Sequence, residues 1–162
     1  MSVRIVPANF RDLSYVASRI RPEDREEVEA QIGPAHYIEL AAMHYRDHAY
    51  VALVNDNPEA AFGAARVAGS HLWNAWMWGG QRMHRAIPAI GRFVTQTMMP
   101  ELLDLGAQRV EARALAKHHT AQRWLEKMGA KECCRLTDYG ISGEEFILYQ
   151  WTRSNVFQPQ DT

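Results

Sequence analysis

The sequence predicts a single α+β domain with a central, mostly antiparallel sheet of about six to seven strands flanked by helices. The order of predicted elements leads to this fold class, because hairpin-forming strands alternate with helices and one strand–helix–strand unit lies in the second half. Size and composition agree, since 162 residues with 47% apolar and 23% charged residues suit one globular domain with its own core. Residues 1–153 form the predicted domain, and residues 154–162 form a loose polar tail.

The formal net charge of −1 gives no electrostatic field that favours nucleic acid or a membrane surface. No apolar run approaches the ~20 residues that span a bilayer, and residues 1–6 lack the apolar segment of a signal peptide, so we expect a cytoplasmic protein. The two cysteines, Cys133 and Cys134, are adjacent. Neighbours on a strand point to opposite faces, so we expect one buried thiol, one exposed thiol and no metal site.

The first part of the chain is predicted to be one strand followed by three helices. Residues 3–6 alternate as a strand. Asn9 can cap a helix whose apolar face is formed by Leu13, Val16, Ala17 and Ile20. Pro22 suits the first turn of a second helix, which ends at Gly33, and residues 37–45 form a third.

Three short strands follow and predict an antiparallel meander. They cover residues 49–55, 60–67 and 71–78, with turn signals between them. Gly63 inside the second strand indicates a bulge or a close neighbour. The third strand carries tryptophans that we expect to share one face, where they either pack the core or line a groove for an acceptor or partner: Trp73, Trp76 and Trp78.

A polar, basic turn and a long amphipathic helix come next. The turn is Gln81-Arg82-Met83-His84-Arg85, and the apolar stripe of the helix is Ile87, Ile90, Val94, Met98, Leu102 and Leu105. Because Pro88 fits only a first helical turn, the helix starts near residues 85–87. Pro100 is expected to kink the helix or end it early, and Gly106 stops it. A turn that opens a helix presents free backbone N–H groups to an anion.

The last third of the sequence predicts a strand, a short helix and a hairpin. Residues 108–114 alternate, which gives an apolar face and a charged outer face, the latter formed by Arg109, Glu111 and Arg113. The short helix follows residues 117–120, and its buried face is Ala121, Trp124, Leu125 and Met128. Gly129 closes it, and residues 132–136 and 145–151 form the hairpin.

The short helix carries the most specific motif of the chain. Its segment, His118-His119-Thr120-Ala121-Gln122-Arg123-Trp124-Leu125-Glu126-Lys127-Met128-Gly129-Ala130, resembles the Asn-x-x-Ala…Glu-Lys-x-Gly-Phe segment of the GCN5-related N-acetyltransferase (GNAT) superfamily. His118 stands where Asn is usual, and Ala130 where Phe is usual. By order of elements the resemblance covers nearly the whole chain, and it implies a splayed central sheet. Residues 21–27 also resemble a divergent, phage-encoded GNAT-like branch that includes internal virion proteins.

The resemblance implies that acetyl-CoA binds at the splayed strand, with its pyrophosphate on backbone N–H groups of the turn that opens the long helix. The family signature there is Arg/Gln-x-x-Gly-x-Gly/Ala. This sequence matches it at Gln81 and Ala86 but has His84 in place of Gly, and a side chain there crowds the phosphates unless it turns away. Arg82, His84 and Arg85 supply cationic groups instead. Two interpretations stay open: the turn binds CoA with altered contacts, or the fold is kept and the cofactor is lost.

The resemblance also implies the site residues. The predicted cofactor-binding residues are Trp76, Met77, Trp78, Gln81, Arg82, Met83, His84, Arg85, Ala86, Ile87 and His118. In the family, backbone N–H groups of the strand before the turn bind the developing oxyanion, and a tyrosine often protonates the leaving thiolate. Leu125 occupies that tyrosine position. His118 and His119 are the candidate catalytic groups, because imidazole titrates near neutrality; alternatively, His118 only starts the helix and His119 is solvated.

The function predicted from the sequence is acetyl-CoA-dependent N-acyl transfer, in which an amine attacks the thioester directly. The amine belongs to a small molecule or a protein. Acids near the start of the second helix either bind this amine as a cation or only favour the helix start: Glu23, Asp24, Glu26 and Glu27. The alternative is a GNAT-fold protein without catalysis that binds a host protein or serves in a virion. No metal cofactor is expected, and homodimer formation stays open.

Overall fold

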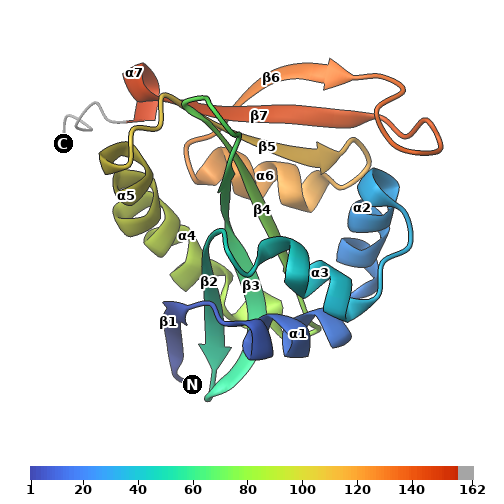
Figure 1. The fold of residues 1–162 in the computed structure, drawn as a ribbon, viewed down its shortest axis with the longest axis vertical. Helices are drawn as coiled ribbons and strands as arrows, with labels where there is room; N and C mark the ends of the chain where they lie inside the picture. Colours follow the sequence, from blue (N-terminus) through green and yellow to red (C-terminus); the bar gives the residue numbers. More distant parts are fainter. Residues whose placement is uncertain (157–162) are drawn as a thin grey trace.

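The computed structural model describes residues 1–156, which form one seven-stranded sheet flanked by helices (Figure 1). The strand order is β1-β2-β3-β4-β5-β7-β6, and within these residues β4 and β5 form the one parallel pair. The predicted α+β class and the parallel strand–helix–strand unit are therefore confirmed. The strands are β1 (Val3–Pro7), β2 (His48–Val54), β3 (Asn57–Arg66), β4 (Leu72–Gly79), β5 (Arg109–Leu115), β6 (Lys131–Leu136) and β7 (Phe146–Thr152).

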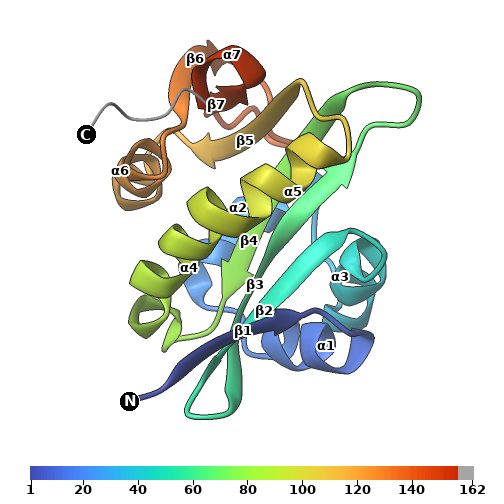
Figure 2. The same cartoon turned by 90° about the vertical axis from the view of Figure 1, so that its left-hand side faces the viewer.

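Helices cover both faces of the sheet (Figure 2). The helical elements are α1 (Phe10–Ser18), α2 (Pro22–Ile32), α3 (Tyr37–His44), the 3-10 turn η1 (Met83–Arg85), α4 (Ile87–Phe93), the π-helical turn η2 (Val94–Met98), α5 (Met99–Asp104), α6 (His119–Lys127) and α7 (Arg153–Val156). The larger core lies between the sheet and α4, η2, α5 and α6, whereas α1 and α3 bury a second core on the opposite face. The helix α2 lies beside the open part of the sheet (Figure 1).

Local sequence signals explain the first helices. The Asn9 side chain accepts a hydrogen bond from the Asp12 N–H at 2.8 Å, as an N-cap does. Leu13, Val16 and Ala17 of the predicted face are buried, whereas Ile20 lies after the end of α1 and is half-buried. Pro22 lies at the first position of α2. A capping box formed by His36 and Glu39 starts α3. These caps hold α2 and α3 in the places where they border the candidate site.

The long helix continues past Pro100 to Asp104, so the predicted early end is wrong. A proline cannot donate to the carbonyl four residues earlier, and its ring clashes with that carbonyl in a regular α-helix. The turn immediately before Pro100 is π-helical, and the Met99 N–H donates to the Val94 carbonyl, five residues earlier. The wider turn thus changes the hydrogen-bond pattern where Pro100 has no N–H. Leu105 lies after the helix and is 57% exposed, outside the buried stripe.

The sheet splays between β4 and β5. Their parallel pairing runs only from Leu72 opposite Arg109 to Asn74 opposite Glu111, and the rest of β4 diverges from β5. On its other edge β4 stays paired with β3 as far as Gly79. The sheet is therefore open on one side of the second half of β4.

The strands test two further predictions, one for Gly63 and one for the two cysteines. A Cβ atom on Gly63 would lie 2.5 Å from the His48 carbonyl oxygen, so the close neighbour predicted from this glycine is confirmed. Cys133 and Cys134 are both exposed, so the prediction of one buried thiol is wrong. The reason is that β6 is the edge strand of the sheet, in which residues 131–135 are all exposed. Of the predicted tail, residues 154–156 belong to α7, and residues 157–162 lie outside the described part.

Candidate active site between the splayed strands

Two hollows meet where β4 and β5 separate. The first, which we call the apolar cavity, has a volume of about 210 Å³ and lies between the splayed strands, α4, η2 and α6. The second, which we call the charged groove, has a volume of about 450 Å³ and lies on the opposite face beside α2 and α3. Residues that line both hollows are Asp24, Glu27, Ala75, Trp76, Met77 and Arg113. The splay therefore connects the two faces of the sheet at one place.

The edge of β4 offers backbone hydrogen-bonding groups to this opening. Gly80 N–H donates to the Glu59 carbonyl of β3 at 2.9 Å, and in an antiparallel pair such bonds alternate along the strand. The N–H groups of Ala75, Met77 and Gly79 consequently face β5, with which pairing has already ended. The Gly79 N–H donates a hydrogen bond to Asp24 Oδ2 at 2.8 Å. The groups of Ala75 and Met77 remain directed into the splay.

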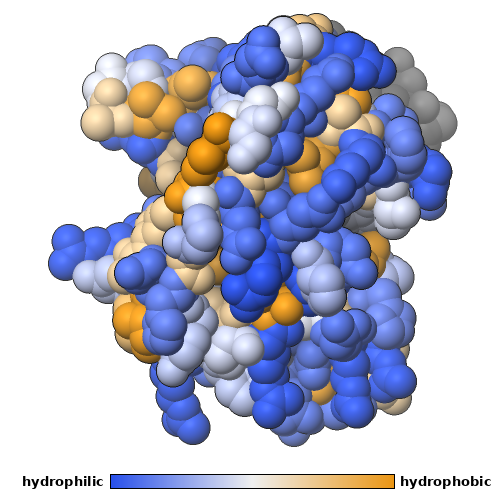
Figure 3. Space-filling view, turned by 90° about the vertical axis from the view of Figure 1, so that its right-hand side faces the viewer, coloured by the Kyte–Doolittle hydropathy of each residue, from blue (hydrophilic) through white to orange (hydrophobic). Residues whose placement is uncertain are grey.

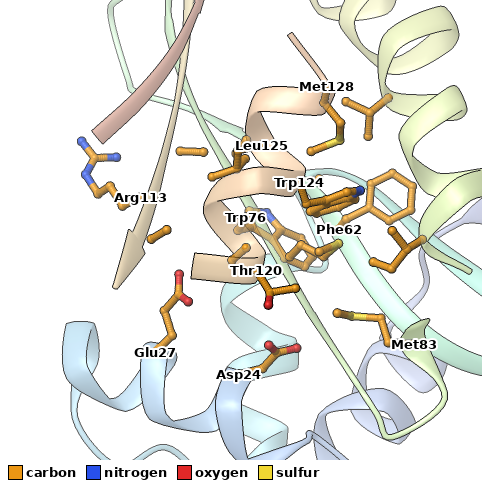
Figure 4. A pocket seen from close by; sticks show the side chains of 18 of the residues that line it. Asp24, Glu27, Phe62, Trp76, Met83, Arg113, Thr120, Trp124, Leu125 and Met128 are labelled. Carbon is orange, nitrogen blue, oxygen red and sulfur yellow. The ribbon is translucent and has the colours of Figure 1, made fainter. Parts of the chain in front are cut away.

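The apolar cavity is lined mainly by large apolar side chains (Figure 4). Leu125 of α6, Met128 directly after α6 and Met83 of the turn are buried in its wall, and Trp124 is half-buried. Leu125 fills the position where the resemblance implies a tyrosine. Among the described residues that line the cavity, Thr120 carries the one hydroxyl group. The cavity suits a slender apolar ligand.

The turn after β4 is tightly folded. Arg85 N–H and Ala86 N–H donate to carbonyls within the turn, at 3.0 and 2.9 Å, so they are not free for an anion. Ile87 N–H, at the start of α4, has no backbone partner in the described chain, and Pro88 has no N–H. The His84 imidazole is exposed, and its Nδ1–H donates to the Gln81 carbonyl at 3.1 Å. The imidazole thus turns back onto its own loop.

The two predicted catalytic histidines lie at the start of α6 but outside both hollows. His118 Nδ1 lies 3.1 Å from Glu27 Oε2, and His118 Nε2 lies 3.4 Å from Glu26 Oε2. The hydrogen bond to Glu27 is the main reason why the pKa of His118 is raised, against the effect of burial. His118 therefore joins α6 to α2 through two carboxylates, and His119 is exposed.

The predicted cofactor residues divide into two groups. Those that line the apolar cavity are Trp76, Met77, Met83, His84 and Ile87. Those that lie outside its wall are Trp78, Gln81, Arg82, Arg85, Ala86 and His118. The expectation that the three tryptophans share a face is wrong, because Trp73 packs in the larger core while Trp76 and Trp78 stack on the other face, with ring centroids 5.5 Å apart.

Asp24 is a buried carboxyl group at the junction of the two hollows. Its side chain is 12% exposed, and Oδ1 lies 3.0 Å from Arg21 Nε. Burial raises the pKa of Asp24 to about 6, although the Arg21 guanidinium and the Gly79 N–H both favour the ionised form. A carboxyl group that titrates near neutrality at such a junction can accept a proton from a bound ligand.

The charged groove contains a pair that is not predicted from the sequence. His44 Nδ1 lies 2.8 Å from Asp47 Oδ2, and the same oxygen accepts a hydrogen bond from Trp76 Nε1 at 2.9 Å. The His44 ring stacks on Trp76 with centroids 3.9 Å apart. The only sequence signal is the spacing of three residues at the end of a helix, which is common in structural pairs.

The charged residues of β5 do not form the predicted outer face. Glu111 is only 8% exposed, and it accepts hydrogen bonds from Arg109 Nε at 2.6 Å and Arg113 Nη2 at 3.0 Å. The prediction of a solvated charged face is therefore wrong. The alternation is correct, but this face of β5 is covered, and Arg113 projects into the charged groove.

This architecture is that of the GNAT acetyltransferases: a seven-stranded, mostly antiparallel sheet that splays at its one parallel pair. The acetyltransferase (GNAT family) from Bacillus anthracis superposes with a TM-score of 0.69 at 11% identity, over 94% of this chain and 95% of that chain. The ribosomal-protein-S18-alanine N-acetyltransferase from Escherichia coli superposes with a TM-score of 0.69 at 14% identity, over 99% of each chain. AAC(6')-Ib in complex with ribostamycin and coenzyme A superposes with a TM-score of 0.70 at 14% identity, over 100% of this chain and 99% of that chain. At these identities the likeness establishes the fold.

No protein-family model matches the sequence, and no curated protein matches it. No comparison supports the narrower resemblance to a phage-encoded branch, which stays a prediction. No helix within residues 1–156 is both long and apolar enough to cross a membrane.

Proposed function

We propose that this protein is an acetyl-CoA-dependent N-acetyltransferase. The observation that carries the proposal is the splay of β4 and β5, because it joins an apolar cavity on one face to a charged groove on the other. A reaction between a thioester and an amine needs two such approaches, one for each substrate. The predicted pairing of an acyl donor and an amine acceptor fits this geometry.

In this proposal the acyl thioester lies in the apolar cavity, and its nucleotide end lies at the turn after β4. Arg82 and Arg85 supply positive charge there, and Ile87 offers a free N–H at the helix start. The Met77 N–H, directed into the splay, binds the carbonyl oxygen of the thioester and stabilises the negative charge that develops on it.

The amine approaches from the charged groove as an ammonium ion and loses one proton to Asp24. The neutral nitrogen then forms a bond to the acyl carbon, and the bond from that carbon to sulfur breaks. The leaving thiolate takes up a second proton from the nitrogen, relayed by the Thr120 hydroxyl, the one hydroxyl among the described residues that line the cavity. Asp24 is preferred over His118 as the base, because Asp24 borders both hollows whereas His118 is held by two carboxylates.

We further propose that the acceptor is a small-molecule amine. The structure of AAC(6')-Ib holds both ribostamycin and coenzyme A, so the same fold accommodates a small acceptor beside the cofactor. The groove volume of about 450 Å³ suits an acceptor of modest size.

A second candidate is a GNAT-fold protein without catalysis, which binds a host protein, in line with the predicted phage branch. Leu125 in place of tyrosine and the internally bonded turn favour it. Against it, the face on the side of α2 is mainly hydrophilic, and hydrophobic atoms gather there only in small groups (Figure 3). Broad docking faces usually carry larger apolar patches.

Calorimetric titration with acetyl-CoA and CoA tests the proposal. We expect binding with a micromolar to millimolar Kd and a rise in melting temperature by mass action. Release of CoA thiol should then follow only when an amine is added. A protein that shows no binding at millimolar acetyl-CoA would leave the second candidate as the better one.

A further inference from the structure

Arg113 brings a positive charge into the charged groove from β5. Its side chain is 22% exposed and reaches the groove and the splay. Figure 4 shows its guanidinium pointing away from Leu125 and Met128, which form the apolar wall of the cavity. The charge is therefore presented on the acceptor side of the sheet.

The contacts of Arg113 leave this charge partly uncompensated. Glu111 is shared by two guanidinium groups, those of Arg109 and Arg113. The other hydrogen bond of Arg113 goes from Nη1 to the neutral Asn74 Oδ1 at 3.1 Å. In the described chain no carboxylate besides Glu111 lies within 4.0 Å of Arg113. The three charged side chains together carry one net positive charge.

The Nε atom of Arg113 points to the same conclusion. It is buried from solvent and has no hydrogen-bond partner among the described residues. A buried donor without an acceptor is costly, and proteins normally satisfy such groups. A carboxylate placed beside Arg113 in the groove would compensate the charge of the guanidinium, which binds carboxylates through its N–H groups.

Carboxyl groups lie on the α2 side of the same groove. Asp24 and Glu27 border the splay there, where Asp24 also contacts Arg21 and Glu27 also contacts His118. Arg113 is the one arginine or lysine among the described residues that line the groove. Between the two charges the wall is apolar, with Leu40, Met43 and Trp78. Such a groove matches a ligand with an ammonium group, a carboxylate and an apolar side chain.

We propose that the acceptor is a free amino acid, with its carboxylate on Arg113 and its amine toward Asp24 and Glu27. This assignment rests on the proposed N-acetyltransferase function. In the reaction the ammonium nitrogen of the amino acid loses one proton to Asp24 and forms a bond to the acyl carbon, while the C–S bond breaks and the leaving thiolate takes up a second proton from the nitrogen. The product is an N-acetyl amino acid, with free CoA.

A carboxylate could also reach Arg113 from the acyl group, as in a succinyl thioester. The test therefore compares acceptors and donors separately. The acceptors are L-leucine, L-leucinamide and 3-methylbutylamine, which share a side chain but differ at the carboxylate. The donors are acetyl-CoA and succinyl-CoA, each used with 3-methylbutylamine. The readouts are kcat/KM from thiol release and Kd from calorimetry with each acceptor alone, which needs no turnover.

We expect the wild-type protein to prefer L-leucine over both analogues that lack the carboxylate by roughly tenfold to a hundredfold, as expected for a lost charged hydrogen bond. Arg113→Gln should abolish the preference, and Arg113→Lys should keep part of it. The lysine variant keeps the positive charge, so it also serves as a second test if Arg113→Gln does not fold. Arg109→Gln is the matched control, because Arg109 shares Glu111 but does not line the groove. It should keep the preference.

Equal use of the three acceptors by the wild-type protein would overturn the assignment and leave N-acetyl transfer intact. A preference for succinyl-CoA that Arg113→Gln removes would also overturn it, because the carboxylate would then belong to the donor. If acetyl-CoA does not bind but L-leucine binds more tightly than leucinamide and depends on Arg113, the proposed function fails while the amino-acid site stands.

Discussion

The apolar cavity and the charged groove lie on opposite faces of the same strands, yet they are built differently. Most residues that line the cavity lie between positions 75 and 128, along β4, the turn, the long helix, β5 and α6, and α2, β3 and β7 supply the rest. The groove draws its polar groups from α2, α3, β4 and β5, which lie far apart in the sequence. The second half of the chain therefore supplies most of the cavity wall, whereas the groove is assembled from both halves.

Because of this difference, the two hollows provide two different kinds of ligand specificity. The cavity is lined mainly by apolar side chains and offers few polar contacts, so it discriminates by length and shape. The groove contains buried charges with defined partners, so it discriminates by chemical type. The following variants test whether the two hollows act independently, as the separation implies.

The largest effect is expected from Asp24→Asn at the junction. Asparagine keeps an oxygen acceptor for the Gly79 N–H but cannot take a proton, so kcat/KM at pH 8 should fall by about 100-fold or more. The wild-type rate should itself fall as the pH drops through about 6, where Asp24 becomes protonated. Glu23→Gln, at an exposed neighbour, is the control. A full rate in Asp24→Asn, measured by thiol release, would remove Asp24 from the mechanism.

The next largest effects are expected from two matched substitutions, each of which replaces an alanine by a phenylalanine in one of the two hollows. Ala121→Phe adds a ring inside the apolar cavity and should weaken acetyl-CoA binding by roughly tenfold or more, with little change in acceptor binding. Ala65→Phe adds the same ring to the wall of the charged groove and should do the reverse. Calorimetry with each ligand separates the effects. If both variants weaken both ligands equally, the hollows do not act independently.

The stability of the fold should also report on Asp24. Its pKa of about 6 in the folded state lies above the ordinary value of 3.8, so folding favours the protonated form. This contribution is fully present below pH 4 and is lost as the pH rises through 6, at a cost of up to about 3 kcal/mol. Asp24→Asn avoids the cost but loses the Arg21 pair, so it should be more stable than wild type by about 1–2 kcal/mol at pH 8. Urea unfolding at pH 4.5 and pH 8 measures the difference, which should grow with pH.

The smallest effect is expected at the turn. Arg85 is exposed and contributes only charge, so Arg85→Ala should weaken CoA binding by about threefold to tenfold, and less at high salt. Arg92→Ala, at an exposed position farther along the same helix, is the control. Dephospho-CoA and CoA compared by calorimetry show which phosphate is involved. Identical affinities for wild type and Arg85→Ala would place the anion site elsewhere.

The contrast between the two hollows also explains which features of the protein can be predicted from the sequence and which cannot. The strand and helix periods, the glycine at position 63 and the capping groups are local signals, and the fold follows from them. The motif from His118 to Ala130 likewise points to the helix that lines the cavity. Glu111 and Arg113, by contrast, alternate like any solvated strand face, and their burial depends on how α2 and the loop after β6 cover β5. The His44–Asp47 pair has the spacing of an ordinary helix-end contact, so its neighbour Trp76 cannot be predicted from the sequence.

The π-helical turn at Val94–Met98 has a consequence for how this cavity can change over evolution. A π-helical turn holds one residue more than an α-helical turn, and Met98 and Met99, neighbours in sequence, are both buried and both line the cavity. In the proposed function this turn therefore helps to set the depth of the acyl site. We expect deletion of Gln96 combined with Pro100→Ala, which removes the ring that a regular helix does not accommodate, to restore a regular turn and to change which acyl chain lengths are accepted. A series of acyl-CoA thioesters measures this change, and the amine preference should stay the same.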